Sequence, residues 1–367
     1  MNPRQLMGLA GGFLLVYVVI TLTNRPAVTL PEASPGGASA VGGAPHVAGH
    51  PVADERIRGF TLMPPAGDAV DGAEGLARLP ALAATGARWV ALRPVVTQPT
   101  GTAAEVPAAS ATPVDLEAWR RVVQAAHAAG LAVMLRPLVA AADGTRREAI
   151  APPDAATWLA TWERALDPWL ALARDEQVEL VCLGSNLTQL QGDPAWRGVV
   201  TRARTVYPGK LTYASSVEAD AFQAVGWWDA LDYVGLDAFF PLSTEAEPNG
   251  EALRQGWRNV AARLTAWRTG QASPPVLFTS VGMPRQAGGA ASPAQPDATG
   301  LSDEQLPARA AEALFATVWG QPWFAGLFWH TWSGGGVAHA PYRTADTPTA
   351  EVLSTQFRAG EGPRAAR

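Results

Sequence analysis

Side chains that could transfer protons or bind a charged or polar ligand stand at or near the ends of short apolar runs in this sequence. They include the carboxylate of Asp237, the imidazole of His330 and the guanidinium groups of Arg93 and Arg136. Carboxylates and imidazoles are common general acids and bases, and guanidinium groups bind anions through paired hydrogen bonds. These residues can act together only if the fold brings the ends of the apolar runs into one place.

The apolar runs alternate with helical patterns along most of the chain. Runs rich in Val, Leu and Phe predict eight strands, at 57–63, 88–93, 132–136, 179–183, 211–214, 233–239, 276–281 and 326–332, each followed by a helix. Eight regular strand–helix units are typical of a (β/α)8 TIM barrel, an α/β fold. A doubly wound open sheet is the alternative, but no G-x-G-x-x-G pattern follows the first strand. In a barrel the strand ends meet at one mouth, where active sites lie.

Composition restricts the classes of function. The chain has 367 residues, 48% of them hydrophobic and 17% charged, which allows a large core and excludes global disorder. The formal net charge is −5 and no basic block occurs, so we expect no nucleic-acid partner. The single Cys182 excludes an internal disulfide and any multi-cysteine metal site. We expect neither a metal nor a cofactor.

The first residues read as a membrane signal. Residues 6–22 are almost wholly apolar and follow Arg4, which predicts a transmembrane signal anchor over 1–23. A cleaved signal peptide, and hence secretion, is the alternative. Residues 24–54, rich in Pro, Gly and Ala, predict a disordered linker, 55–358 the barrel, and 359–367 a disordered tail. We expect a single-pass protein of the cell membrane with an extracytoplasmic barrel.

Seven segments within this pattern point to one family. They are TGARWVALRP, TPVDLEAWRRVVQAAHAAGLAVMLRP, AWRGVVTRARTVYPGKLTYA, LDYVGLDAFFPL, PPVLFTSVG, GLFWHTW and TPTAEVL, in this order. Together they resemble glycoside hydrolase family 113, a group of β-mannanases with (β/α)8 barrels. The resemblance covers most of residues 57–357. It implies a retaining glycosidase ancestry and a polysaccharide or oligosaccharide partner, of which β-mannan is the model.

The resemblance also shows what this chain has lost. Enzymes of the family carry an acid/base Glu after the fourth strand, in a G-[ST/N]-E-[LF] phrase, and a nucleophilic Glu after the seventh, in a T-E-[VI]-G phrase. The matching phrases here are GSNL and TSVG, with Asn186 and Ser280 at the two positions. The resemblance therefore implies that both catalytic carboxylates are replaced.

These replacements remove both halves of the mechanism. Retaining hydrolysis uses two carboxyl groups about 5 Å apart, one as acid/base and one as nucleophile. The Asn186 amide has no proton to give at neutral pH, and the Ser280 hydroxyl would need an adjacent base. A relocated pair is the alternative, with Asp237, Glu218 and Glu148 as the possible substitutes. Asp143, Glu245 and Glu247 lie in nearby loops, and all of these could equally be solvated loop residues or helix caps.

Candidate ligand-binding residues stand at the predicted mouth. They are Arg93, Arg136, Tyr213, Asp237, Phe239, Trp329, His330 and Trp332. Trp329 and Trp332 end the last strand and could stack on a sugar ring, whereas tryptophans at helical positions are expected to pack on the barrel. For Asp237 an ion pair with Arg136 is favoured over sugar binding, because a buried carboxylate needs a partner.

Three functions remain open at this point. The first is a membrane-anchored, non-catalytic carbohydrate-binding pseudoenzyme, with a groove and no suitably spaced carboxylate pair. The second is an active, β-mannanase-like glycoside hydrolase with a relocated pair. The third is a structural or interaction protein of the cell envelope whose mouth is filled by its own side chains, for example by the loop 286–300.

Overall fold

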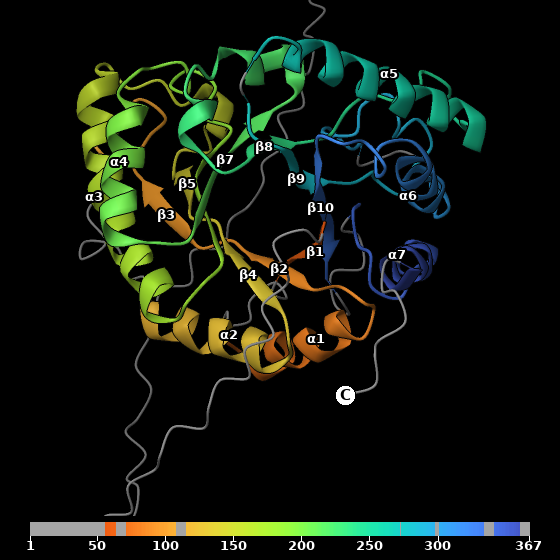
Figure 1. The fold of residues 1–367 in the computed structure, drawn as a ribbon, viewed down its shortest axis with the longest axis horizontal. Helices are drawn as coiled ribbons and strands as arrows, with labels where there is room; N and C mark the ends of the chain where they lie inside the picture. Colours follow the sequence, from red (N-terminus) through yellow and green to blue (C-terminus); the bar gives the residue numbers. More distant parts are fainter. Residues whose placement is uncertain are drawn as a thin grey trace, which may run out of the picture. The chain divides into compact units, whose positions relative to one another are not determined.

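The computed structural model describes residues 56–63, 71–107, 115–271, 273–297, 301–333 and 341–359, and in them eight parallel strands close into a barrel (Figure 1). The strands are β1 (Ile57–Leu62), β2 (Trp89–Leu92), β4 (Ala132–Leu135), β6 (Leu180–Ser185), β7 (Lys210–Ser216), β8 (Val234–Asp237), β9 (Val276–Val281) and β10 (Phe324–Trp332). They follow one another in chain order, and β10 pairs with β1 to close the ring. The predicted TIM barrel is confirmed, with strand ends shifted by at most a few residues.

Helices surround the strands on the outside (Figure 1). They are α1 (Ala73–Ala83), α2 (Leu116–Ala128), α3 (Ala155–Asp175), α4 (Trp196–Val206), α5 (Gly250–Arg268), α6 (Leu306–Thr317) and α7 (Pro348–Ala359). The expectation of a helix after every strand is wrong at one place. Between β7 and β8 the chain forms only the short 3-10 segments η3 (Glu218–Ala224) and η4 (Trp228–Ala230). Ala219 and Asp220 have positive φ angles there, which breaks a regular helix.

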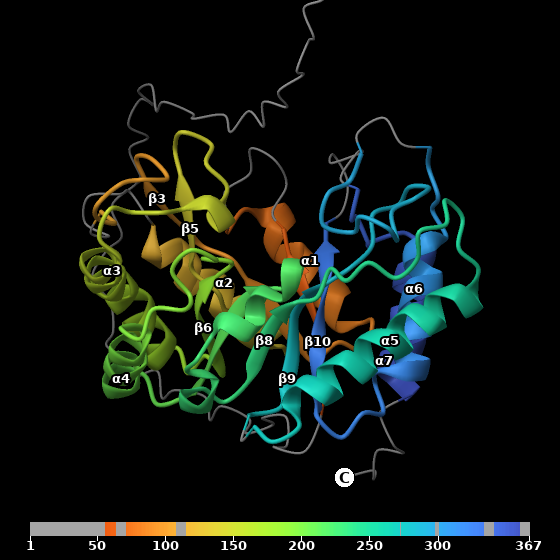
Figure 2. The same ribbon diagram turned by 90° about the horizontal axis from the view of Figure 1, so that it is seen from above.

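Two further strands extend the barrel wall beyond two of its strands, and the sequence reading missed them. β3 (Val95–Gln98) and β5 (Leu138–Ala141) form a separate two-stranded parallel sheet. Each follows a barrel strand after a proline, Pro94 or Pro137. Proline cannot donate to a ladder, so the pairing of β2 with β4 is interrupted there and resumes in the same register between β3 and β5. This small sheet carries the segment that includes η2 (Arg147–Ala149) at its end (Figure 2).

The barrel interior is a packed core. Inward-facing residues form one buried cluster, which includes Trp89, Met134, Cys182 and Phe328. Cys182 serves here as a small apolar side chain, and it is fully buried. Gly59 is required here, because a Cβ at this position would lie 2.7 Å from the Phe328 ring. The rigid interior fixes the directions in which the strand ends point.

A second, larger cluster lies between the strands and the helices. Trp158, Trp162 and Trp169 of α3 are fully buried in it, as is Trp257 of α5. The prediction that helical tryptophans pack on the barrel is thereby confirmed. Burying aromatic side chains of this size contributes strongly to holding a helix on a sheet.

The predicted anchor over 1–23, the linker over 24–54 and most of the predicted tail lie outside the described residues. Ala359, the first residue assigned to the tail, is the last residue of α7. Within the part of the chain that the structure describes, every helix is too short or too polar to cross a membrane.

Candidate active site

A cavity of about 540 Å³ lies where the carboxyl ends of the barrel strands meet. Six of the predicted residues line it directly from strand ends: Arg93 after β2, Arg136 after β4, Asn186 after β6, Asp237 at the end of β8, Ser280 in β9 and His330 in β10. Such a volume suits a small ligand or a few sugar rings. The fold therefore brings together residues that lie far apart in the sequence.

Asp237 and Arg136 form a buried ion pair at the centre of this cavity. Arg136 Nη2 lies 2.6 Å from Asp237 Oδ2, and the two side chains are only 2% and 9% exposed. Arg136 also donates from Nε to Ser185 Oγ at 2.8 Å and from Nη1 to the Thr279 carbonyl at 3.3 Å. The ion pair that the sequence favoured is confirmed.

Asn186 completes the surroundings of Asp237. Its amide nitrogen donates to Asp237 Oδ2 at 2.9 Å, and Thr279 Oγ1 donates to Asp237 Oδ1 at 3.0 Å. Asn186 has a φ of +52°, a conformation that Asn tolerates better than most residues. Among the described residues no group donates to Asn186 Oδ1, which is buried. This oxygen is therefore a buried hydrogen-bond acceptor, without a partner there, on a residue that lines the cavity.

The charges around Asp237 fix its protonation state. Burial raises the pKa of this carboxyl, but the Arg136 guanidinium, its hydrogen bond, the charge of Arg93 and the Thr279 hydroxyl outweigh burial and hold the pKa below its ordinary value. The pKa of its partner Arg136 is raised, because the negative charge of Asp237 outweighs the lowering effect of burial. Asp237 is therefore an anion at neutral pH and has no proton to donate.

An aromatic wall bounds another side of the cavity. The rings of Phe239, His330 and Tyr342 all line it and meet edge to face, with centroids 5.2–5.8 Å apart. Tyr342 was not predicted. It reaches His330 because residues 341–344 fold back on β10, where the Thr331 amide donates to the Tyr342 carbonyl at 3.0 Å.

His330 is held neutral in this wall. Burial and the charge of Arg93 move its pKa well below the ordinary value, and the opposing effect of Asp237 does not compensate. Its Nδ1 is buried and has no hydrogen-bond partner among the described residues. A neutral imidazole of this kind can exchange a hydrogen bond with a ligand hydroxyl.

Three of the predicted ligand-binding residues lie elsewhere. Tyr213, Trp329 and Trp332 are buried in the cluster between strands and helices and do not line the cavity. Trp332 packs against Phe60 with ring centroids 4.9 Å apart. Successive residues of a strand point to opposite faces, so the strand that turns His330 to the cavity turns Trp329 away from it.

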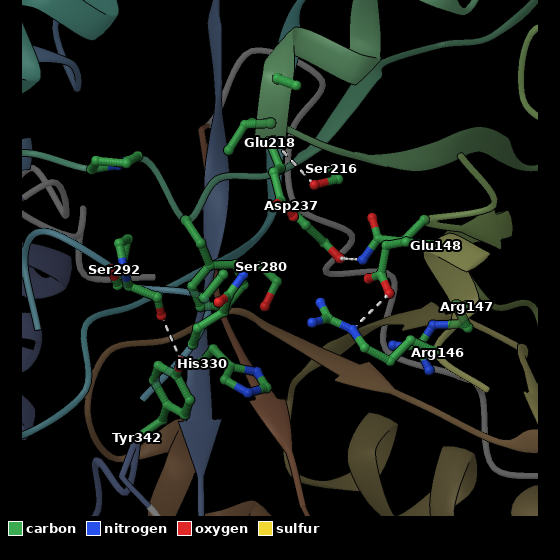
Figure 3. Close-up of a pocket in the computed structure, with 18 of the residues that line it drawn as sticks. Arg146, Arg147, Glu148, Ser216, Glu218, Asp237, Ser280, Ser292, His330 and Tyr342 are labelled. Carbon is green, nitrogen blue, oxygen red and sulfur yellow. Dashed lines mark hydrogen bonds and ion pairs between the residues drawn. The ribbon is translucent and has the colours of Figure 1, made fainter. Parts of the chain in front are cut away.

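The remaining acidic residues of the cavity differ in their surroundings. Glu148 pairs with Arg146 at 3.3 Å, and Asp220 pairs with Arg263 at 3.4 Å. Glu218 lines the cavity from the start of η3 and is exposed (Figure 3). The loop candidates Asp143, Glu245 and Glu247 do not line this cavity.

The loop that could have filled the mouth forms part of its wall. Residues 291–295 line the cavity, and the Tyr342 hydroxyl donates to the Pro293 carbonyl at 2.5 Å. Residues 298–300 lie outside the described residues. No cluster of three or more potential metal ligands occurs in the described ranges.

Comparison with known proteins supports the ancestry of this barrel. The sequence model of glycoside hydrolase family 113 matches residues 60–346. Solved structures of a GH113 β-1,4-mannanase in complex form and of the β-mannanase AaManA from Alicyclobacillus acidocaldarius with ManMIm are similar to this chain. Each has a TM-score of 0.72, and each match covers 83% of this chain. The first structure is 21% identical to this chain and is matched over 99% of its own length. The second is 24% identical and is matched over 98% of its own length.

A more distant barrel is the GH5_18 protein of Bifidobacterium longum subsp. longum. Its TM-score is 0.58 at 13% identity, over 85% of this chain and 80% of that one. No curated protein matches the sequence. The family match extends over most of the described barrel, from β1 to the segment that carries Tyr342. The chain therefore belongs to glycoside hydrolase family 113.

Proposed function

We propose that this barrel binds a glycan without hydrolysing it. The family resemblance assigns the acid/base position to Asn186 and the nucleophile position to Ser280, and neither side chain can supply a carboxyl group. Asn186 is instead engaged as a hydrogen-bond donor to Asp237. An uncharged amide in this place can read a sugar hydroxyl but cannot protonate a leaving oxygen.

The observation that carries this proposal is that both carboxylate oxygens of Asp237 already accept hydrogen bonds from the protein. Its Oδ2 accepts from Arg136 and Asn186, and its Oδ1 accepts from Thr279. A general acid must hold a proton, and a nucleophile must present a lone pair to the anomeric carbon. Asp237 is held as an anion whose oxygens are both engaged, so its surroundings oppose either role.

The rest of the cavity suits a sugar. The rings of Phe239 and Tyr342 offer apolar faces and edges to the C–H groups of a pyranose. Asn186 Oδ1 and His330 Nδ1 are buried polar atoms without partners in the described chain. Burying such atoms unpaired costs about 1–3 kcal/mol each, so a ligand hydroxyl that bonds them gains affinity. Because two solved relatives are β-1,4-mannanases, β-1,4-mannooligosaccharides are the first ligands to test.

The test measures binding and cleavage in one mixture. The purified full chain is titrated with β-1,4-mannooligosaccharides by calorimetry, and the same samples are assayed for new reducing ends. We expect binding without cleavage, with affinity lost in Phe239→Ala and reduced in Asn186→Ala. Trp332→Ala in the core serves as a control for general destabilisation.

Two other results would overturn the proposal. Cleavage that is abolished by Glu218→Gln or Glu148→Gln would establish a working hydrolase with a relocated pair. An absence of both binding and cleavage across neutral and acidic glycans would favour an interaction protein of the cell envelope. Asp237→Asn is a poor probe of catalysis, because it also breaks the buried ion pair.

We also propose that the barrel is tethered to a membrane on its extracytoplasmic side. The support is the apolar run 6–22 behind Arg4, followed by the Pro-, Gly- and Ala-rich segment 24–54. Membrane fractionation of the full chain tests this, with a variant that lacks residues 1–23 as the control. Recovery of the full chain in the medium, shortened at its start, would instead indicate a cleaved signal peptide.

A further inference from the structure

The cavity is lined by more positive than negative side chains. Five arginines and four carboxylates belong to its lining, whereas the whole sequence has 28 basic and 33 acidic residues. His330 adds no charge, because its pKa lies well below the ordinary value. The described lining therefore has a net positive charge in a chain that is negative as a whole. A concave surface with one sign of charge concentrates ligands of the opposite sign.

The positive charge is unevenly placed. Arg93, Arg136, Arg146 and Arg147 come from the segments that follow β2 and β4, whereas Glu218 and Asp220 come from η3. Figure 3 shows Arg146, Arg147 and Glu148 on one side of Asp237, with His330 and Tyr342 on the other. The cavity thus has a cationic wall, made of Arg146 and Arg147, opposite His330 and Tyr342 of the aromatic wall.

The segment that presents Arg146 and Arg147 is held in place by the neighbouring loop. Asp143 accepts hydrogen bonds from the Thr145 amide at 2.9 Å and from the Gly101 amide at 3.1 Å. The Ala151 amide donates to the Gly101 carbonyl at 2.9 Å, and Ile150 is fully buried. The two guanidinium groups therefore start from a fixed backbone, which lowers the entropic cost of binding a ligand.

The ion pair on this wall is easily exchanged. Arg146 and Glu148 are 61% and 28% exposed, and their closest nitrogen and oxygen atoms are 3.3 Å apart. Exposed pairs of this kind contribute little, about 0–1 kcal/mol. A ligand anion could replace Glu148 as the partner of Arg146 without disturbing the fold.

We propose that the ligand of this cavity is an acidic glycan whose anionic groups contact Arg146 and Arg147. This inference rests on the glycan-binding function proposed above and adds its substrate class. The sugar ring lies against Phe239 and Tyr342, one hydroxyl donates to Asn186 Oδ1, and a carboxylate or sulfate group faces the cationic wall. Guanidinium groups suit both anions, because each offers oxygens that match the paired N–H donors.

The experiment compares oligosaccharides that differ only in charge. β-1,4-Mannuronate oligosaccharides share the ring configuration of β-1,4-mannooligosaccharides and carry a carboxylate in place of the C6 hydroxymethyl group. Each is titrated into the full chain by calorimetry at equal length, together with a sulfated mannooligosaccharide. We expect at least one anionic ligand to bind about tenfold more tightly than the neutral one at low salt, with the difference shrinking as salt rises.

A matched pair of double variants locates the contact. Arg146→Gln/Arg147→Gln is expected to lose the preference for the anionic ligand while keeping its affinity for the neutral one. Arg174→Gln/Arg202→Gln removes the same charge from residues outside the cavity lining and is expected to keep the preference. Retained binding of the neutral ligand shows that each variant is folded.

The outcomes separate this inference from the function on which it rests. If the neutral ligand binds as tightly as both anionic ones, glycan binding stands and the acidic class is wrong. If the control double variant loses the preference equally, the effect is general electrostatics and the assignment to Arg146 and Arg147 is wrong. If none of the three ligands binds, both proposals fail. A preference for carboxylate over sulfate, or the reverse, supports the inference and identifies the anion.

Discussion

Two ion pairs face the same cavity and differ in almost every physical respect. Arg136 and Asp237 are 2.6 Å apart, almost fully buried, and set at the ends of β4 and β8. Arg146 and Glu148 are 3.3 Å apart, far more exposed, and set on the short segment around η2. The carboxylate of the first pair accepts all its hydrogen bonds from protein groups, whereas the second pair is exposed to solvent.

The difference indicates how the charges of this cavity are divided between the fold and the solvent-exposed wall. A buried pair cannot be broken without leaving an uncompensated charge in a low-dielectric interior, so it has become part of the barrel. An exposed pair costs little to break, so its members stay available to a ligand. An arginine–carboxylate pair therefore serves structure at the centre of the cavity and, in the function we propose, recognition at its wall.

The largest expected effect is on the buried pair. Asp237→Ala leaves Arg136 without its counter-ion, and we expect the free energy of unfolding to fall by about 3–5 kcal/mol. Urea unfolding followed by circular dichroism measures this. Arg136→Met/Asp237→Leu, which removes both charges, is expected to cost less than the single change. Equal cost for Asp237→Ala and Glu148→Ala would remove the contrast between the two pairs.

A smaller effect is expected where the cationic wall is anchored. A Cβ at Gly101 would lie 2.3 Å from Thr145 Cγ2 and 2.6 Å from Thr145 Cβ. Gly101→Ala therefore forces the two loops apart, and we expect a loss of about 1–3 kcal/mol in unfolding free energy. Adding Thr145→Gly removes the atoms that clash and should restore most of the loss. A single variant as stable as the parent chain would show that the loops are not held this closely.

The third prediction concerns acid. The pKa of Asp237 is lowered in the folded chain, so its stabilisation is present above the unfolded pKa of about 3.9 and is lost as the pH falls through the folded value. Urea unfolding at a series of pH values between about 6 and 2 should show this loss. Asp237→Asn should be less stable at neutral pH and should lose less stability on acidification. Parallel profiles for the two proteins would contradict the assignment.

The smallest effect is expected for the exposed pair. A double-mutant cycle with Arg146→Gln and Glu148→Gln should give a coupling energy below about 1 kcal/mol. Added salt should reduce it further, because exposed charges are screened. A salt-resistant coupling as large as that of the buried pair would mean that Glu148 is not exchangeable, and it would weaken the case for an anionic ligand.

The barrel could be predicted from the sequence because its strands are buried on both faces. Such strands are continuous apolar runs, and the predicted strand 276–281 matches β9 at both ends. β3 and β5 were missed because each has only four residues and directly follows a proline, which marks the end of the preceding strand. The helix expected between β7 and β8 fails at Ala219 and Asp220, whose backbone conformations no local pattern announced.

The site could be predicted only in part. The pairing of Arg136 with Asp237 followed from their positions at strand ends, since a buried carboxylate needs a counter-charge. Strict alternation would place Trp329 and Trp332, which are three residues apart, on opposite faces of β10. Both lie in the cluster between strands and helices, because the pairing of β10 with β1 is irregular between them. Tyr342 joins the aromatic wall through the fold of the chain after β10, which no motif marked.

The absence of tryptophan from the aromatic wall has a consequence for the fluorescence of the protein. The sequence contains 14 tryptophans, yet none belongs to the described lining of the cavity. Trp89 lies in the barrel interior, and the others gather between the strands and the helices, where for example Trp196 and Trp227 stack with ring centroids 5.0 Å apart. Intrinsic fluorescence should therefore respond strongly when strands and helices separate and hardly at all when a ligand enters. A large emission change on adding a sugar would signal a rearranged barrel rather than a filled site.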